Sequence, residues 1–443
     1  MTPTTIFALA SGGSRAGIAV IRVSGPEAAR AATTLCGGRD LPARRLVRRR
    51  IVGTEGDTVD EALVVRFPAP ASFTGEEVIE LHVHGGVAVV ADTLQALAAC
   101  PGLRPAAPGE FTRRAFDNGK LDLTAAEGLA DLVQAETSAQ RRQALRQMQG
   151  ELAALYDGWR HRLLVTLAHL EAHIDFADED LPDSIDDRVA VDAAILTEEI
   201  EQHLGDNRRG ERIRDGVCVT ILGPVNAGKS TLLNRLARRE AAIVSSEPGT
   251  TRDVIEVHLD LGGYAVVLRD TAGLRDTDAD VEAEGVRRSR HAAESADLRL
   301  VVFDGAVWPR FDAEAADLLE RDSVAVINKC DLGHVGSPVE VLGHPALQIS
   351  ARNGDGLDRL VEVLEQEVGR RFEAGEAPQL TRIRHRQALE ECRASLKSSA
   401  CASSNELAAE DLRLAARALG RITGRVDVED VLDVIFKDFC IGK

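Results

Sequence analysis

The stretch Gly223-Pro224-Val225-Asn226-Ala227-Gly228-Lys229-Ser230 decides the fold of the central part of this chain. It follows an apolar run, 217–222, and precedes an amphipathic run, 231–237, which predicts a strand, a glycine-rich turn and the start of a helix. The spacing G-x-x-x-x-G-K-S is that of a phosphate-binding loop. Lys229 should reach the β- and γ-phosphates, and the Ser230 hydroxyl should bind Mg²⁺.

Around this loop, residues 213–372 alternate apolar runs with helical patterns. The apolar runs span 217–222, 265–268, 298–303, 324–327 and 346–349. Near-continuous apolar strands separated by helices are typical of a doubly wound, mostly parallel sheet. We therefore expect an α/β P-loop domain over 213–372, within a chain long enough for about two to four domains.

Two further motifs predict how the phosphates and the metal ion are bound. Asp270 ends the strand that begins near Ala265 and opens the sequence Asp-Thr-Ala-Gly, in which the Asp can hold Mg²⁺ through water and the Gly N–H can face the γ-phosphate. The loop Gly249–Asp253 lies between this motif and the phosphate-binding loop. Thr251 in that loop is the natural second ligand of Mg²⁺.

Two more motifs predict that the base is guanine. Asn328-Lys329-Cys330-Asp331 follows a strand, and the Asp331 carboxylate can accept paired hydrogen bonds from guanine N1–H and N2–H₂, whereas adenine would leave it poorly matched. Ser350-Ala351-Arg352 closes the base pocket. The residues expected around GTP are Asn226, Ala227, Gly228, Lys229, Ser230, Thr231, Ser245, Ser246, Glu247, Pro248, Gly249, Thr250, Asp270, Thr271, Ala272, Gly273, Asn328, Lys329, Asp331, Ser350, Ala351 and Arg352.

The hydrolytic group is not the usual one. In Ras-type enzymes a Gln after Asp-x-x-Gly orients the attacking water, but Leu274 stands there in this chain. A leucine cannot polarise water, so another residue must do so. The candidates are Arg275, Arg252 and the acids just downstream, of which Glu282 is favoured.

The rest of the chain divides around this domain. Residues 1–118 mix short strands with helices and predict an α+β domain, while 119–212 and 373–443 are helical. Thr124-Ala-Ala-Glu127 suggests a capping box, and apolar residues from Leu145 to Ile174 suggest one long amphipathic helix. The C-terminal stripe includes Leu412, Leu414, Leu419 and Ile422. Because each helical part has an apolar stripe and no partner, we expect them to pack together, with the α/β domain inserted between them.

Charge and cysteine content narrow the class of protein. The net charge is −18, which argues against a general nucleic-acid coat, although residues 1–120 carry 14 basic and 12 acidic side chains. The seven cysteines are scattered and form no C-x-x-C pair, which is typical of reduced thiols. No apolar run is long enough to cross a bilayer. We therefore expect a cytoplasmic protein with no membrane partner.

The whole chain resembles the MnmE (TrmE) family of tRNA-modification GTPases. Besides the GTPase motifs, the resemblance rests on Ser72-Phe-Thr-Gly75-Glu76, Glu80-Leu-His-Val-His-Gly-Gly86, Pro108-Gly-Glu-Phe111, Gly119-Lys-Leu-Asp-Leu123 and the ending Phe439-Cys440-Ile441-Gly442-Lys443. It implies an N-terminal domain that dimerises and binds a tetrahydrofolate, either the 5-formyl or the 5,10-methylene form. The positions that match its folate contacts are Arg22, Glu80, Lys120 and Lys443.

The resemblance also implies how GTP is hydrolysed. G domains of a homodimer pair across the nucleotide, and a K⁺ ion supplies positive charge. The positions that match the K⁺ ligands are Asn226, Ser245, Glu247 and Thr250, and Glu282 matches the acid that positions the water. The sequence departs from the family pattern in two places. Pro224-Val225 stands where the family usually has x-Pro, and Glu247 stands where the family is commonly apolar.

The resemblance finally implies the reaction and its partner. With an FAD-containing protein of the MnmG (GidA) type, the complex adds a carboxymethylaminomethyl or aminomethyl group to C5 of wobble uridine 34 in certain tRNAs. Cys440 would lie near that chemistry, as a nucleophile or as a plain terminal thiol. His82 and His84 share one face of a strand, and without a third ligand a structural role is favoured over a metal site.

Two other functions stay open from the sequence. One is a ribosome-assembly GTPase, which would need a basic RNA-binding domain where this chain is acidic and helical. The other is a folate-dependent one-carbon transferase that carries the GTPase as a regulatory part.

Overall fold

The structure is a computed structural model that describes residues 4–13, 15–175, 184–239, 242–243, 256–270, 293–294, 296–320, 322–333, 336, 339–373, 377–426, 432, 435–436, 439 and 442. The chain divides into two compact units. The first comprises Met1–Ala130, Gln147–Ala193 and Ala394–Lys443, and the second comprises Asp131–Arg146 and Ala194–Arg393.

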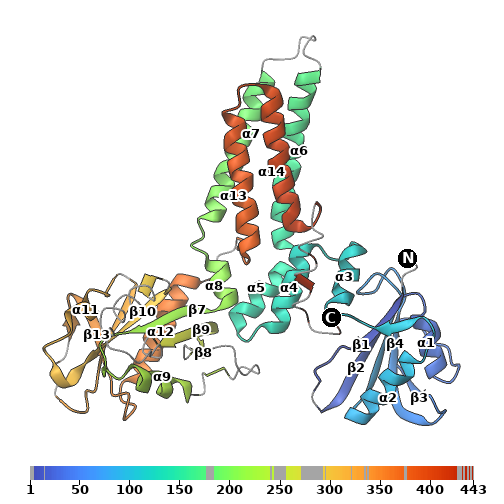
Figure 1. Cartoon of the computed structure of the whole chain (residues 1–443), viewed down its shortest axis with the longest axis horizontal. Coiled ribbons are helices and arrows are strands. Elements are labelled where there is room, and N and C mark those ends of the chain that lie inside the picture. Colours follow the sequence, from blue (N-terminus) through green and yellow to red (C-terminus); the bar gives the residue numbers. More distant parts are fainter. Residues whose placement is uncertain are drawn as a thin grey trace, which may run out of the picture. The chain divides into compact units, whose positions relative to one another are not determined.

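The first unit contains a six-stranded sheet in the order β3-β4-β5-β2-β1-β6 (Figure 1). Its strands are β1 (Thr5–Leu9), β2 (Ala16–Ser24), β3 (Val47–Val52), β4 (Thr58–Phe67), β5 (Val78–Gly85) and β6 (Leu103–Pro105). All neighbouring strands are antiparallel except β1 and β6. Helices α1 (Ala28–Leu35) and α2 (Val87–Ala98) pack on this sheet, and Ile21, Val64 and Leu81 are fully buried in the core. This arrangement is the α+β one that the sequence predicts.

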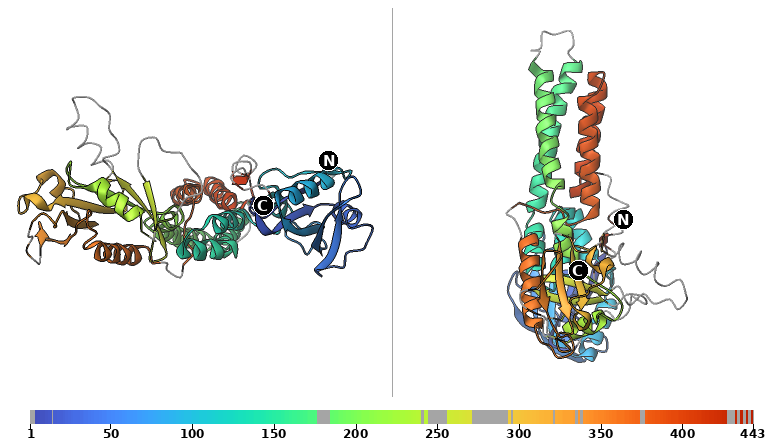
Figure 2. Two further views of the ribbon diagram at one scale, coloured as in Figure 1. Left: turned by 90° about the horizontal axis from the view of Figure 1, so that it is seen from below. Right: turned by 90° about the vertical axis from the view of Figure 1, so that its left-hand side faces the viewer.

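The helices of the first unit include α3 (Glu110–Asp117), α6 (Glu151–Asp175) and α14 (Asn405–Thr423). Helix α6 packs along α14, although the two are far apart in the sequence (Figure 1, Figure 2). Leucines on the facing sides are buried, among them Leu163 and Leu419. The division between the two units falls within four helices, α4 (Leu123–Gln134), α5 (Ser138–Met148), α7 (Ser184–Leu204) and α13 (Ile383–Ala400).

The expected long helix from Leu145 to Ile174 is wrong. It is two helices, because α5 (Ser138–Met148) ends and α6 begins on either side of Gly150, whose φ is +87°. A left-handed glycine ends a helix at little cost, since it has no Cβ atom to clash with the turn.

Two smaller expectations about the helices are also wrong. Thr124 does not cap α4, because the Asp122 carboxylate accepts hydrogen bonds from the N–H groups of Thr124 and Ala125, at 2.8 and 3.0 Å. Asp122 is therefore the N-cap, one of the residue types that helix starts prefer. Leu414 does not belong to the buried stripe of α14, since it is 45% exposed.

The second unit contains a seven-stranded sheet in the order β12-β13-β11-β10-β7-β9-β8. Its strands are β7 (Val217–Leu222), β8 (Glu256–Leu261), β9 (Tyr264–Asp270), β10 (Leu298–Asp304), β11 (Ser323–Asn328), β12 (Glu340–Val341) and β13 (His344–Gln348). The five predicted apolar runs correspond to β7, β9, β10, β11 and β13, which pair in parallel. The short or half-polar strands β8 and β12 pair antiparallel at the edges and were missed.

Apolar side chains cover both faces of this sheet. Helices α9 (Lys229–Ala237) and α12 (Leu357–Phe372) share a core with Val219 and Val302 of the strands. The neighbouring residues of β10, Val301 and Phe303, belong to a second core with α11 (Ala313–Ala316), because successive strand residues point to opposite faces. Helix α8 (Arg209–Asp215) leads into β7, and the short 3₁₀ helix η2 (Gly305–Val307) follows β10.

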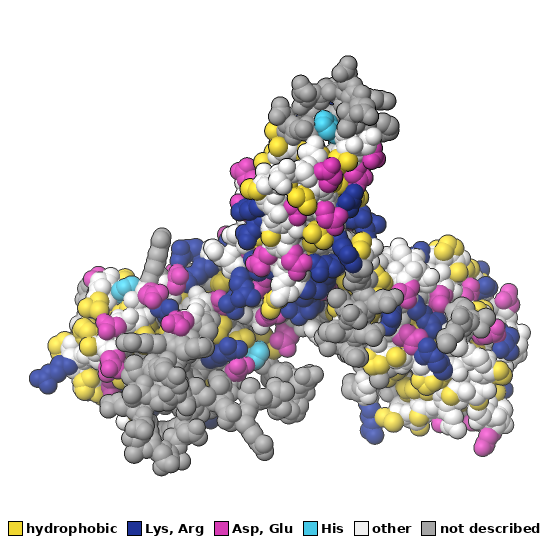
Figure 3. All heavy atoms as spheres, turned by 45° about the horizontal axis from the view of Figure 1, so that its top comes forward, with side chains coloured by type: hydrophobic (Ala, Val, Ile, Leu, Met, Phe, Trp, Pro, Cys, Tyr) yellow, Lys and Arg dark blue, Asp and Glu magenta, His cyan; other side chains and the backbone are white. Residues whose placement is uncertain are grey.

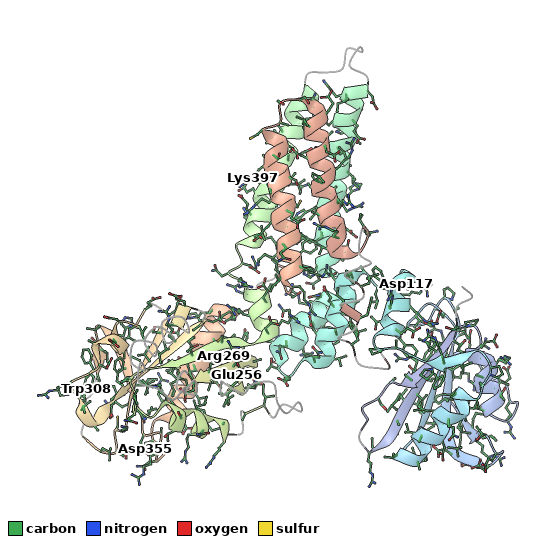
Figure 4. The ribbon with its side chains drawn as sticks, in the orientation of Figure 1. Asp117, Glu256, Arg269, Trp308, Asp355 and Lys397 are labelled. Carbon is green, nitrogen blue, oxygen red and sulfur yellow. The ribbon has the colours of Figure 1, made fainter. Side chains whose placement is uncertain are left out.

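Charged side chains are spread over the surface. On the face drawn in Figure 3, basic and acidic groups are interspersed over the helices and both sheets. One such pair joins Arg269 to Glu256 across β8 and β9, at 3.0 Å (Figure 4). Among the helices that the structure describes, none has the length and apolar content that a bilayer span requires.

Candidate nucleotide-binding site

The loop between β7 and α9 is shaped by two glycines. Gly223 has φ +136°, and a Cβ atom there would lie 2.2 Å from the carbonyl oxygen of Val302. Gly228 has φ +94°, and its Cβ atom would lie 2.3 Å from Nδ2 of Asn328. Only glycine fits either position, which is why the motif needs both. Between them Asn226 is exposed and left-handed, with φ +65°.

Lys229 lies inside this loop and is only 7% exposed. Its ammonium donates to the carbonyl oxygens of Gly223 and Pro224, at 2.7 and 2.9 Å. Burial lowers the pKa of Lys229, while the nearby charge of Asp270 raises it. A cation held among backbone groups at the start of a helix is suited to bind the phosphates of a nucleotide.

Ser230 and Asp270 bring two oxygen atoms together beside the loop. The Ser230 Oγ donates to Oδ2 of Asp270 at 2.7 Å, and the whole Asp270 residue is 1% exposed. The carboxylate stands at the end of β9, next to β7 in parallel register. Oxygen donors of this kind are the ligands that Mg²⁺ prefers, so the pair fits a magnesium site.

Asn328 links the phosphate loop to the loop after β13. Its Nδ2 donates to the carbonyl oxygen of Ala227 at 2.8 Å, and its Oδ1 accepts from the N–H of Ala351 at 2.9 Å. The residue is 2% exposed, so both groups depend on these partners. One buried amide thus holds together the two loops that the sequence assigns to phosphate and base.

The base side of the site is built by Asp331 and Ser350. The Ser350 hydroxyl donates to Oδ1 of Asp331 at 2.7 Å, and it also accepts from the N–H of Asn353 at 3.1 Å. This fixes the Asp331 carboxylate and leaves its second oxygen available for a donor pair such as guanine offers. Figure 4 marks Asp355, whose carbonyl accepts from the N–H of Ser350, and Trp308, which follows η2.

Lys329 has a partner that sequence reasoning missed. Its ammonium lies 2.6 Å from Oδ2 of Asp304, the last residue of β10. The position of Asp304 in the sequence could have indicated this contact, because Asp304 ends a parallel strand at the same edge as the other motifs. Asp304 belongs to no named motif, however.

In the first unit, Arg22 and Glu80 are cross-strand partners on β2 and β5. Nη2 of Arg22 lies 2.9 Å from Oε1 of Glu80. The guanidinium also lies over the rings of Phe73 and Phe111, at 5.4 and 5.8 Å from their centroids. Phe111 is fully buried, so the partly exposed Phe73 is the ring of the two that could stack on a flat heteroaromatic ligand. Lys120, the third predicted contact, is exposed beside Gly75.

The motif Ser72–Glu76 is held by a polar network. Glu76 accepts from Ser24 at 2.7 Å and pairs with Arg114 of α3 at 3.0 Å. Thr74 is fully buried, with its hydroxyl 2.7 Å from that of Ser24. These contacts fix the loop that carries Phe73 against Arg22.

The motif Pro108–Phe111 meets the C-terminal segment. Gly109 has φ +66°, and a Cβ atom there would lie 2.5 Å from the carbonyl oxygen of Phe436 and 3.1 Å from Cβ of Phe439. A Cβ on Gly442 would lie 2.0 Å from the carbonyl oxygen of Leu9. The described residues near the end of the chain are therefore seated against Leu9 and Gly109 of the N-terminal part.

The two histidines of β5 have carboxylate partners. Nε2 of His82 lies 3.5 Å from Oε2 of Glu80, and Nδ1 of His84 lies 2.8 Å from Oδ1 of Asp60. Within the described residues, no group of three or more histidine, cysteine or acidic side chains could hold a metal ion.

Comparison with known proteins decides the family. A model described as the MnmE helical domain matches residues 123–440, and one described as the N-terminus of the GTP-binding protein TrmE matches residues 5–120. The chain belongs to the MnmE family. The resemblance recognised from the motifs is thereby confirmed.

Full-length relatives agree with this assignment. The protein named tRNA modification GTPase MnmE of Paramagnetospirillum magneticum is 57% identical over 99% of both chains. Its namesake in Rhodospirillum rubrum is 55% identical over 100% of both. A solved G domain of the T. maritima FeoB iron transporter is 23% identical over 34% of this chain and 98% of its own, at a TM-score of 0.25, which is too low to add to the argument.

Several expected site residues of this MnmE-family chain lie outside the described residues. They are Ser245, Ser246, Glu247, Pro248, Gly249, Thr250, Thr251, Thr271, Ala272, Gly273, Glu282, Cys440 and Lys443. Of the others, the structure brings Ala227, Gly228, Lys229, Ser230, Asp270, Asn328, Lys329, Asp331, Ser350 and Ala351 together at one edge of the second sheet. Thr231 and Arg352 are exposed beside them.

Proposed function

We propose that this chain is the GTP-hydrolysing subunit of a complex that modifies the wobble uridine of certain tRNAs. The group added at C5 of uridine 34 is carboxymethylaminomethyl or aminomethyl. The observation that carries the proposal is the bridge from Asn328 to Ala227 and Ala351, which joins a phosphate loop to a base loop. It occurs in a chain whose full-length relatives are named tRNA modification GTPases.

In this proposal each residue of the nucleotide site has a defined task. Lys229 binds the β- and γ-phosphates with its buried ammonium, and the backbone of 226–231 surrounds them. Asp331 selects guanine over adenine through the carboxylate that Ser350 holds in place.

Magnesium fits the oxygen atoms that the site presents. Ser230 and Thr251 would bind it, with Asp270 acting through water. When bound, Mg²⁺ supplies positive charge against the β- and γ-phosphates. Ser230 is already oriented toward the metal side, because its hydroxyl points to Asp270.

Potassium and the hydrolytic acid complete the proposed reaction. The K⁺ ion would be held by Asn226, Ser245, Glu247 and Thr250. Asn226 supports this, because it is exposed and left-handed, so its side-chain amide can bind an ion outside the phosphate-binding loop. K⁺ supplies positive charge where other GTPases use an arginine. Glu282 would orient the attacking water, since Leu274 cannot. Two copies of the chain would pair through their G domains.

The N-terminal part would bind the one-carbon donor. The 5-formyl- or 5,10-methylene-tetrahydrofolate would be held by Arg22, Glu80, Lys120 and Lys443. The partly exposed ring of Phe73 beside Arg22 supports a flat ligand there. The folate supplies a one-carbon unit. An FAD-containing partner of the MnmG type would complete the complex, with Cys440 near the modification chemistry.

The proposed domains follow the motifs. They are the folate-binding and dimerisation domain 1–118, the helical parts 119–212 and 373–443, and the inserted G domain 213–372. The free thiols of the described cysteines and the proposed tRNA substrate support a cytoplasmic site of action.

The experiment that tests the function is nucleoside mass spectrometry of tRNA from a strain that lacks the gene. We expect the modified wobble uridine to disappear and to return with the wild-type gene. Unchanged modification in the deletion strain would refute the proposal.

Two further measurements test its parts. GTP turnover in K⁺ against Na⁺ should differ strongly, and equal rates would remove K⁺. Turnover of Glu282→Ala should fall by at least about a hundredfold, the scale of a lost general base.

A further inference from the structure

The parallel strands β10 and β11 end side by side, and the last residues of both strands face each other in register. Asp304 of β10 is the Cα partner of Asn328 of β11. Lys329 comes directly after Asn328, and its backbone is left-handed, with φ +65°. A side chain in this conformation leaves the strand in a direction that a right-handed residue would not give.

The carboxylate of Asp304 is bound at both oxygens. Oδ2 lies 2.6 Å from the ammonium of Lys329, and Oδ1 accepts from the N–H of Ala306 at 2.9 Å. The side chains of Lys329 and Asp304 are 28% and 21% exposed. The carboxylate of Asp304 is therefore fixed by its short side chain and by the hydrogen bond from η2, independently of Lys329.

An ion pair on a protein surface usually contributes little, because two long side chains must give up their freedom to form it. Here the acidic partner is already fixed, so only the lysine is ordered. The ion pair therefore fixes the direction of the Lys329 side chain, because its four-carbon stem is held by the backbone at one end and by Asp304 at the other. Lys329 directly follows Asn328, whose side chain bridges the phosphate and base loops, so the stem of Lys329 starts beside that bridge.

We propose that Asp304 is a positioning residue for purine binding. It fixes the stem of Lys329 against the ring of the base, while Asp331 reads the edge of the base. This inference rests on the proposed function, because it assumes that the site binds a guanine nucleotide.

Asp304→Asn in the full chain tests the inference. Asparagine keeps the size of the side chain and the oxygen that accepts from Ala306, but it loses the charge that holds Lys329. We expect the dissociation constant of a fluorescent GDP to rise about fivefold, through faster dissociation, which is the upper end for a part-exposed ion pair.

Asp312→Asn is the matched control. Asp312 also accepts from a backbone N–H, that of Ala315 at 2.8 Å, at the start of α11. Among the residues that the structure describes, Asp312 has no hydrogen bond or ion pair to the nucleotide loops. The Asp312→Asn variant should bind GDP like the wild type, and its melting temperature should be close to that of Asp304→Asn. Equal GDP affinity of the two variants would overturn the inference.

Two readouts separate positioning from a general loosening of the site. Binding of GDP and of inosine diphosphate should weaken by the same factor, because the stem meets the ring and not the 2-amino group. In a Lys329→Met background, Asp304→Asn should have no further effect on affinity. A changed ratio of GDP to inosine diphosphate, or an additive effect, would show that Asp304 does not act through Lys329.

The wild-type chain distinguishes this failure from failure of the proposed function. If it does not prefer GDP over ADP, the guanine site itself is refuted. If it does, and Asp304→Asn still binds GDP like the wild type, the positioning role alone is refuted.

Discussion

The side-chain amide of Asn328 donates to the carbonyl oxygen of Ala227 at 2.8 Å, and so ties the end of one strand to the loop after another. Asn328→Ala should lower the free energy of unfolding by about 2 kcal/mol, because it removes a buried amide and leaves two backbone groups without their partner. Affinity for GTP should fall by at least about tenfold, since the two loops lose their common anchor. Urea unfolding and nucleotide titration measure these two effects.

Asn353→Ala serves as its control. Asn353 lies in the base loop but is exposed, and only its backbone takes part in the contacts there. It should change neither quantity appreciably. If Asn328→Ala binds GTP as tightly as Asn353→Ala does, the bridge does not organise the site.

The contact between Ser230 and Asp270 predicts how the site depends on magnesium. Ser230→Ala removes the oxygen that we propose as an Mg²⁺ ligand, so the Mg²⁺ concentration for half-maximal GTP turnover should rise by about tenfold or more. Ser323→Ala, at the opposite end of the parallel strands, should leave that concentration unchanged. A magnesium titration of both variants is the measurement, and coinciding curves would exclude Ser230 as a ligand.

The sequence predicted which residues come together at the edge of the second sheet better than it predicted the bounds of the helices. The motifs placed Gly228, Lys229 and Asp331 at one edge of the sheet, because each motif follows the end of a parallel strand. Asp304 was missed because the contact that gives it meaning joins two strands in space. The strand β3 was hidden by three consecutive arginines, 48–50, which form neither an apolar run nor an apolar–polar alternation.

The helices show why periodicity alone is not enough. Apolar spacing continues from Leu145 to Ile174 across Gly150, although the backbone there turns left-handed. One glycine outweighs the pattern on both sides. Likewise Asp122 competes with Thr124 for the cap of α4 and succeeds, because its carboxylate reaches two N–H groups.

His203 makes stability depend on pH. Burial in the second unit lowers its pKa to about 4, while Asp206 opposes this and Arg386 adds to it. In the unfolded chain the imidazole of His203 binds a proton near pH 6.5. Between about pH 6.5 and 4, His203 is therefore protonated in the unfolded chain and neutral in the folded chain. Stability should therefore fall as the pH drops through this window.

His203→Gln should remove part of that dependence. The fall in melting temperature between pH 7 and pH 5 should become smaller. The corresponding change in the free energy of unfolding should be no more than about 1–2 kcal/mol, because solvent screens the charge of His203. Gln202→Asn, the neighbour on α7, should shift the melting temperature equally at both pH values. An unchanged pH profile in His203→Gln would show that another group is responsible.

Gly109 seats the C-terminal segment, and its effect can be separated from backbone strain. Gly109 and Gly119 have almost the same backbone, with φ +66° and +65°, but only Gly109 has atoms within 4 Å of its missing Cβ, those of Phe436 and Phe439. Alanine at either site should cost about 1 kcal/mol through the left-handed conformation. Gly109→Ala should in addition displace the segment, so carboxypeptidase should release its residues several times faster than in Gly119→Ala. Equal release from the two variants would mean that the end of the chain is not held at Gly109.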